Sequence, residues 1–247
     1  MENLLRSGLS VLIILVCVWD SRAQSSDSLR LQAFYQGQTG NCASVALIKA
    51  AIDRYGLGQV FDTIRTGSLV RIKLRSSQEL TVTDAERRQA TGAAMFVRCD
   101  TTQTGINRNS LPSAEAAQIV QYANLCYAVM AKFIATYGEY DCLRRDNTTA
   151  DPEPVASFTA ALATLADGVC SDNVYRHLGL EVLNAKHVEF DPSLDLTHTP
   201  GVVVYSNKHA VMLWRKYFDF HGDWITRSRR GQCETAHFQA KFYFVLK

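Results

Sequence analysis

The segment from Gln36 to Ser44 holds the residue types of a cysteine nucleophile and its surroundings. Cys42 directly precedes an apolar stretch with helical spacing, so its thiol is expected at a helix N-terminus, where unpaired backbone amides lower a thiol pKa and favour the thiolate. Gln36 lies upstream, and its side-chain amide is suited to donate a hydrogen bond to the oxyanion that forms when a thiolate attacks a carbonyl. Gly37 and Gly40 are expected to let the backbone approach a substrate closely.

The order Gln-Gly-x-x-Gly-x-Cys before an apolar helix resembles the nucleophile segment of papain-like and calpain-like cysteine peptidases. The residues that carry the resemblance are Gln36, Gly37, Gly40 and Cys42. In that family the glutamine completes the oxyanion hole and the cysteine attacks the substrate carbonyl, and the resemblance implies these roles for Gln36 and Cys42. The sequence departs from the family at Ala43, where papain and calpain relatives carry a tryptophan.

A thiolate of this kind needs a histidine from elsewhere in the chain to take up its proton and later to protonate the leaving amine. His209 is the best candidate, because it follows the turn-prone segment 206–208 and opens an apolar run. Papain-like relatives place their histidine at such a strand start. His187 is the rival, and His177 falls at an expected helix end, where a histidine is a favourable charge partner for the helix dipole. The other histidines are interpreted as loop or strand-edge residues: His198, His221 and His237.

The residue that orients the imidazole is expected on the strand that follows His209. The papain-like family uses Asn or Asp for this role, and no Asn follows His209 in this chain. Asp219 and Asp223 are therefore the candidates, with a solvated turn residue as the alternative interpretation of each.

The length of the hairpin turn decides between these two aspartates. A three-residue turn over 215–217 would set His209 opposite Asp223 on the same face of the sheet. A two-residue turn would instead oppose His209 with Gly222 and point Asp219 toward the other face. The His-Gly-Asp sequence that ends at Asp223 is a competing turn, which would remove this aspartate from the strand. We favour Asp223 over Asp219.

Hydrophobic periodicity predicts helices first and strands later. A capping box at Thr83-Asp84-Ala85-Glu86 opens one of the helices, and Gly138 and Gly168 end two others. This order predicts an α+β domain with an N-terminal helical layer, which carries the nucleophile at a helix start, and a C-terminal antiparallel β-sheet layer. The predicted helices span 42–55, 84–94, 114–137 and 158–167, and the predicted strands span 70–74, 80–82, 202–205, 210–214, 217–220, 224–226 and 242–246.

The N-terminal residues 1–23 have the layout of a secretory signal peptide. Their apolar run, Leu9–Trp19, is too short to span a bilayer comfortably, and the small residues around Ala23 predict cleavage before Gln24. We therefore expect a secreted papain-like domain over 24–247, without stable membrane insertion. The formal charge of +2 gives no electrostatic footprint for nucleic acid.

Six cysteines remain after the predicted cleavage. None forms a Cys-x-x-Cys pair and no Cys/His cluster has the spacing of zinc ligands, so neither a metal nor a cofactor is expected. Cys126 lies in an apolar run and is predicted to be a buried core thiol. Cys42 is expected as a free thiol, whereas disulfides are open to some of the others: Cys99, Cys142, Cys170 and Cys233.

Together these features predict a secreted cysteine peptidase that hydrolyses peptide or protein substrates through an acyl-enzyme. Cys42 would be the nucleophile, His209 the acid and base, and Gln36 the oxyanion donor, with Asp223 or Asp219 orienting the imidazole. An amidase or acyltransferase with the same Cys-His dyad is an alternative, because the chemistry up to the acyl-enzyme is shared. A catalytically inactive binding module is the alternative from another class, and thiol reactivity distinguishes it.

Overall fold

The computed structural model describes residues 29–99, 112–139, 153–184, 188–220, 223–226 and 238–247. The predicted signal peptide and two of the cysteines, Cys142 and Cys233, lie outside the described residues. Within the described part of the chain, no helix combines the length and the apolar character needed to cross a membrane.

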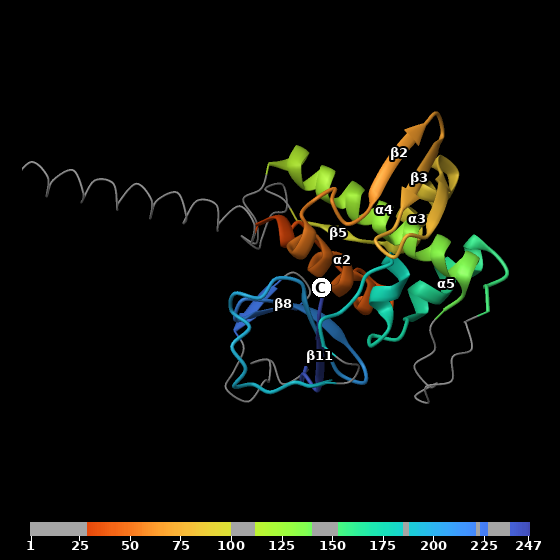
Figure 1. The fold of residues 1–247 in the computed structure, drawn as a ribbon. Coiled ribbons are helices and arrows are strands. Elements are labelled where there is room, and N and C mark those ends of the chain that lie inside the picture. Colours follow the sequence, from red (N-terminus) through yellow and green to blue (C-terminus); the bar gives the residue numbers. More distant parts are fainter. Residues whose placement is uncertain (1–28, 100–111, 140–152, 185–187, 221–222, 227–237) are drawn as a thin grey trace, which may run out of the picture.

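A buried helix, α2 (Cys42–Tyr55), lies at the centre of the molecule (Figure 1). Its residues from Ala43 to Ile52 are all buried, because one side packs on helices and the other on a sheet. The helical layer around it contains α3 (Asp84–Ala94), α4 (Ser113–Tyr137), α5 (Phe158–Asp167) and the 3-10 helix η1 (Val174–Leu178).

Two small antiparallel sheets accompany the helical layer. β1 (Phe34–Tyr35) pairs with β5 (Val97–Arg98), and β2 (Asp62–Thr66), β3 (Leu69–Lys73) and β4 (Glu79–Thr83) form a three-stranded sheet. The last strand runs directly into α3 through the predicted capping box, in which the Thr83 hydroxyl accepts from the Glu86 amide and the Glu86 carboxylate accepts from the Thr83 amide.

The C-terminal part of the chain forms a six-stranded sheet in which every pair is antiparallel. Alternate residues of its central strands face two different cores: Ala210 and Met212 pack with α2, whereas Val211 and Leu213 pack on the opposite face. In spatial order the strands are β10 (Asp223–Thr226), β9 (Tyr217–Phe220), β8 (Ala210–Trp214), β7 (Val202–Tyr205), β11 (Phe242–Val245) and β6 (Val188–Glu189).

Polar contacts at the C-terminal end of α2 join it to this sheet. The Asp53 carboxylate accepts a hydrogen bond from the Gly201 amide at 2.8 Å, next to the start of β7. The Tyr55 hydroxyl donates to the backbone oxygen of Lys247 at 2.9 Å. This helix therefore connects the layer that carries the predicted nucleophile with the layer that carries the predicted histidine.

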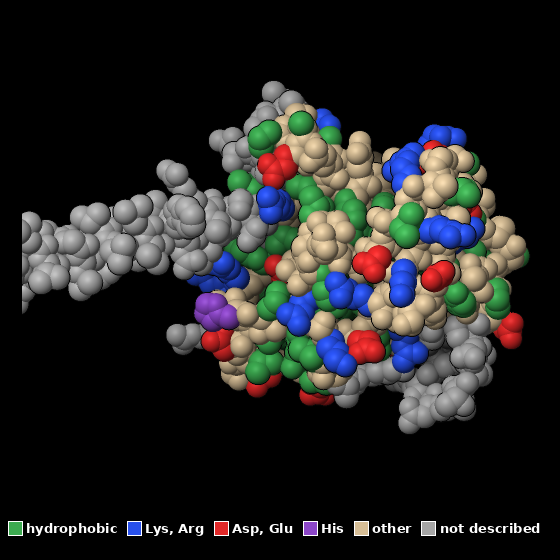
Figure 2. Space-filling model, turned by 45° about the horizontal axis from the view of Figure 1, so that its top comes forward, with side chains coloured by type: hydrophobic (Ala, Val, Ile, Leu, Met, Phe, Trp, Pro, Cys, Tyr) green, Lys and Arg blue, Asp and Glu red, His purple; other side chains and the backbone are tan. Residues whose placement is uncertain are grey.

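The structure confirms an α+β architecture with antiparallel sheets. The predicted helix bounds agree with α2, α3 and α5, and α4 begins one residue earlier than predicted. The edge strand β2 was not predicted, because all of its residues are exposed and it shows no alternation of buried and exposed positions. On the face shown in Figure 2, described Lys and Arg side chains are interspersed with Asp and Glu.

Candidate active site

Cys42 is the first residue of α2 and carries a free thiol. The preceding residue, Asn41, occupies the N-cap position without a side-chain hydrogen bond to the first turn. Its buried side chain instead donates to the backbone oxygen of Ala94, at the end of α3, at 2.8 Å. The first amides of α2 therefore keep their hydrogen-bonding capacity for the thiol and for a ligand beside it.

Burial raises the pKa of the Cys42 thiol above its ordinary value. Backbone amides of Ala210, Ala43 and Cys42 itself act in the opposite direction, because they donate to the sulfur and stabilise the thiolate. The expectation of a lowered pKa was wrong in its net direction, since the cost of desolvation exceeds the effect of the helix N-terminus. A thiolate at this position therefore needs a cationic neighbour.

The loop before Cys42 is held between the C-terminal ends of two helices. The Gly40 amide donates to the Ala166 oxygen of α5 at 2.6 Å. A Cβ atom on Gly40 would lie 2.8 Å from the Asp167 oxygen, and one on Gly37 would lie 2.2 Å from the Met95 oxygen at the end of α3. The glycines were expected to make room for a substrate, but in the structure they make room for these helix ends.

The Gln36 side chain lies beside Cys42 and shares two cavities with it. Its amide nitrogen donates to the backbone oxygen of Thr39, which fixes the side chain within its own loop. A side-chain amide has two N–H groups, so the second remains suited to an oxyanion.

His209 lies directly before β8, at the predicted strand start. The Ser206 amide donates to the His209 oxygen at 2.8 Å, and the Ser206 hydroxyl accepts from the His209 amide at 3.2 Å. The edge-to-face rings of Phe220 and Phe238 flank the imidazole, with centroids 5.3 and 5.8 Å from its own. A tight turn thus sets the backbone, and aromatic packing restricts the side chain.

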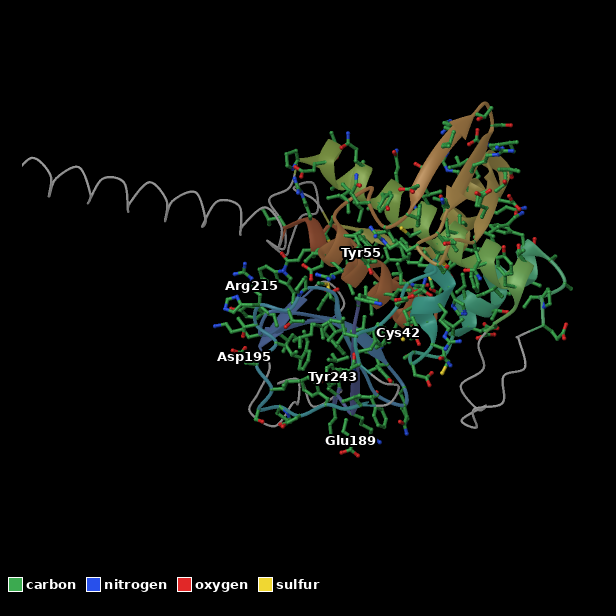
Figure 3. All side chains as sticks on the ribbon, in the orientation of Figure 1. Cys42, Tyr55, Glu189, Asp195, Arg215 and Tyr243 are labelled. Carbon is green, nitrogen blue, oxygen red and sulfur yellow. The ribbon has the colours of Figure 1, made fainter. Side chains whose placement is uncertain are left out.

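Cys42 and His209 line the same open pocket, although they come from opposite ends of the chain. Figure 3 places Cys42 at the start of α2, where the helix meets the six-stranded sheet. The pocket has a volume of about 480 Å³, which is the size of a small-molecule or peptide side-chain site. Its walls come from four segments: the loop before α2 with Cys42 (Gln36, Gly40 and Cys42), the end of α5 and the chain after it (167–172), the end of β7 and the turn to β8 (205–209), and Phe242 of β11.

The hairpin turn between β8 and β9 differs from the predicted one. Trp214 pairs with Tyr217, so the turn contains only Arg215 and Lys216, and Arg215 adopts a positive φ of 55°. The prediction of a three-residue turn, on which the preference for Asp223 rested, is therefore wrong. The two-residue turn that forms contains no glycine or asparagine that could have indicated it in the sequence. Asp223 begins β10 and pairs with Phe220. The alternative in which a His-Gly-Asp turn removes Asp223 from the strand is therefore also wrong.

Asp219 lies on the α2 side of the sheet and is bound by a residue that the sequence analysis missed. Its Oδ2 lies 2.5 Å from Nζ of Lys49, and both side chains are buried. Lys49 is the only charged residue between Ala43 and Ile52, a stretch of α2 that is buried throughout. That isolated lysine in an apolar helix was the available signal, because a buried cation requires a buried anion.

His177 is part of the core and not of the site. It lies in η1, fully buried, with its ring 6.0 Å from that of Phe133. Burial lowers its pKa to about 3, so it is neutral at ordinary pH and does not act as the charged partner of a helix dipole. The rival candidate His187 lies outside the described residues, as do His221 and His237.

Cys126 is fully buried in α4, as predicted, and burial raises its pKa. Cys170, by contrast, lies in the wall of the Cys42 pocket, where its thiol donates to the Asp172 carboxylate. Within the described ranges, no three His, Cys, Asp or Glu side chains are grouped so that they could hold a metal ion.

Comparison with known proteins gives no relative on which to base a function. No protein family, curated protein or solved structure matches this chain.

Proposed function

We propose that the protein is a secreted, papain-like cysteine peptidase, with Cys42 as nucleophile and His209 as the acid and base. One observation carries this proposal: the thiol at the start of α2 and the histidine at the start of β8 line one open pocket together with Gln36. Each of the three side chains has the chemistry that its role in a Cys-His acyl transfer requires.

The reaction follows from the chemistry of these groups. His209 takes the thiol proton, and the Cys42 sulfur attacks the carbonyl carbon of a peptide bond to form a tetrahedral oxyanion. In this proposal the Cys42 amide and the Gln36 side chain donate hydrogen bonds to that oxygen. The imidazolium then protonates the leaving amine as the C–N bond breaks, and a water activated by the same imidazole hydrolyses the thioester.

The experiment is hydrolysis of a fluorogenic peptide library by the protein from Gln24 onward, together with labelling by a thiol-directed active-site probe. Cys42→Ala is expected to abolish labelling and to lower hydrolysis by on the order of 10⁴-fold or more, with an unchanged circular dichroism spectrum. Cys170→Ala is the matched control, because it removes a second thiol from the same pocket and should leave both readouts in place.

Other outcomes separate the alternative functions. Labelling of Cys42 with acyl transfer to an added amine, but without peptide hydrolysis, would identify an amidase or acyltransferase. A Cys42 that is no more reactive than an ordinary exposed thiol would identify an inactive binding module. Labelling that maps to Cys170 would remove Cys42 from the mechanism.

A further inference from the structure

Two of the described thiols lie in the wall of one pocket. Cys42 and Cys170 both line the cavity of about 480 Å³, and both are partly exposed to solvent. Cys99 and Cys126, by contrast, are buried in the core. A core cysteine needs only to pack, whereas a thiol that solvent reaches is open to oxidation. The pocket thus brings together the two described cysteines on which an oxidant can act.

The chain segments that carry these two thiols are in direct backbone contact. The Gly40 amide donates to the Ala166 oxygen at 2.6 Å, and a Cβ atom on Gly168 would lie 3.2 Å from the Gly40 oxygen. Cys42 comes two residues after Gly40, and Cys170 comes two residues after Gly168. From this contact both segments continue along the wall of the same pocket. A disulfide requires Cα atoms within about 7 Å of each other, a separation that two backbones in direct contact provide.

Cys170 makes a contact that packing alone does not require. Its thiol donates a hydrogen bond to the carboxylate of Asp172, a residue that is itself buried. A carboxylate acceptor keeps the thiol protonated, and it takes up the proton when the sulfur attacks. The sequence left a structural disulfide open for Cys170, but in the structure this residue is a thiol. Cys170 is therefore equipped to act as a second nucleophile.

We propose that Cys170 is the resolving thiol for Cys42, with which it forms a reversible disulfide when a hydroperoxide oxidises the site. The disulfide blocks the nucleophile and protects it from irreversible oxidation, and a low-molecular-weight thiol restores the reduced enzyme. The inference rests on the proposed function, which makes Cys42 the reactive thiol of the pair. It assigns Cys170 to the regulation of the site and not to peptide hydrolysis.

The oxidation takes place in two balanced steps. In the first, the Cys42 thiolate attacks the peroxide, so that an S–O bond forms, the O–O bond breaks, and the leaving oxygen takes a proton and departs as water or an alcohol. The sulfur loses two electrons and becomes a sulfenic acid, and the peroxide is reduced. In the second, the Cys170 sulfur attacks the Cys42 sulfur, so that the S–S bond forms and the S–O bond breaks. The Cys170 thiol proton passes through Asp172 to the departing hydroxide, which leaves as water.

The surroundings of the two thiols decide which one is oxidised first. Backbone amides donate to the Cys42 sulfur and stabilise negative charge on it, and His209 in the same pocket supplies the cation that burial of this thiol makes necessary. At Cys170 the Asp172 carboxylate opposes a thiolate. Because the thiolate is the form that attacks a peroxide, Cys42 reacts first and Cys170 resolves.

The test is oxidation of the reduced protein from Gln24 onward with hydrogen peroxide, followed by peptide mapping without reduction. We expect a mass loss of two hydrogen atoms and a cross-linked pair of peptides that contain Cys42 and Cys170. Peptide hydrolysis and iodoacetamide labelling of Cys42 should disappear as the disulfide forms. Both should return when dithiothreitol is added.

Cys170→Ser removes the resolving thiol and keeps a hydroxyl that can donate to Asp172. In this variant Cys42 should gain two or three oxygen atoms, and dithiothreitol should restore less than about a tenth of the activity that the variant had before oxidation. Cys99→Ala is the matched control, because it removes a buried thiol that is not part of the pocket wall. It should recover as the native protein does.

The outcomes distinguish this inference from the function on which it rests. If native Cys42 is oxidised to a sulfinic acid, or pairs with Cys142 or Cys233, the inference is overturned and the peptidase proposal stays in place. Full recovery of Cys170→Ser would overturn the inference as well. If the Cys42–Cys170 disulfide forms but the reduced protein hydrolyses no peptide, the thiol pair is supported and the peptidase proposal is overturned.

Discussion

The two sides of the candidate site are held by different kinds of interaction. Cys42 follows a loop whose polar atoms bind the ends of two helices, through Asn41 to Ala94 and through Gly40 to Ala166. His209 follows a tight hairpin turn, and its ring is held by aromatic packing from β9 and from the chain before β11. The backbone around Cys42 is thus fixed by directional hydrogen bonds, whereas the ring of His209 is held by apolar contacts.

This difference explains why the Cys42 side of the candidate site is the easier one to recognise in a sequence. A Cβ at Gly37 or Gly40 would crowd backbone oxygens, and the amide of Gln36 stays within the same loop, so the constraints fall on neighbouring residues. The surroundings of His209 depend on strand pairing, which brings residues together from distant segments. A short sequence motif can therefore indicate the loop before Cys42 but not the surroundings of His209.

The largest effect within this comparison is expected at Gln36. Gln36→Ala should leave probe labelling of Cys42 intact and lower kcat by roughly a hundredfold, because one donor to the oxyanion is lost. The measurement is kcat and KM on a fluorogenic peptide. Gln36→Glu is the matched variant, because it preserves the size of the side chain and removes the N–H groups.

Gln36→Glu should therefore lose at least as much kcat as Gln36→Ala, because its carboxylate also repels the developing oxyanion. If Gln36→Ala keeps full activity, the Gln36 side chain has only a structural role in the loop, through its hydrogen bond to the backbone oxygen of Thr39.

Local sequence signals predicted most of the fold. The capping box at Thr83 gave the start of α3, and Gly138 and Gly168 gave the ends of α4 and α5. These signals succeed because each cap satisfies backbone groups within a few residues of itself. The strands that alternate between two cores were predicted for a related reason, since both faces of the central sheet are apolar.

The features that could not be predicted depend on long-range partners. The turn at Arg215 uses a positive φ on a residue that rarely adopts it, and strand pairing rather than turn chemistry imposes it. Asp219 was identified as a candidate, but its partner on α2 was not, because nothing in either local sequence relates the two. The proximity of Cys42 to His209 was expected only through the family resemblance.

A smaller effect is expected on the histidine side. Phe220→Leu keeps an apolar side chain but removes the ring edge against the imidazole, so His209 should sample orientations that do not reach Cys42. We expect kcat to fall about tenfold with little change in KM. Steady-state kinetics together with thermal unfolding measure this.

Phe190→Leu is the control for lost aromatic packing. Its ring packs against Phe218 and Tyr243 in the same outer core. This variant should lose comparable stability and retain kcat. Equal losses of kcat in both variants would show that general loosening of the sheet, and not the orientation of His209, is responsible.

The smallest effect is a change in stability and compares two glycines of the helical layer. Gly40→Ala places a Cβ within 2.9 Å of two backbone oxygens at the end of α5, so the loop or the helix end must shift, at a cost of about 1–3 kcal/mol. Gly92 lies in α3 with no atom within 4 Å of its would-be Cβ, and Gly92→Ala should stabilise the protein by about 0.5–1 kcal/mol through helix propensity. Urea unfolding of the two variants should therefore give changes of opposite sign. If both variants are stabilised, the contact between Gly40 and α5 is loose. The loop before Cys42 is then not held by the end of α5, and the contrast with the His209 side is lost.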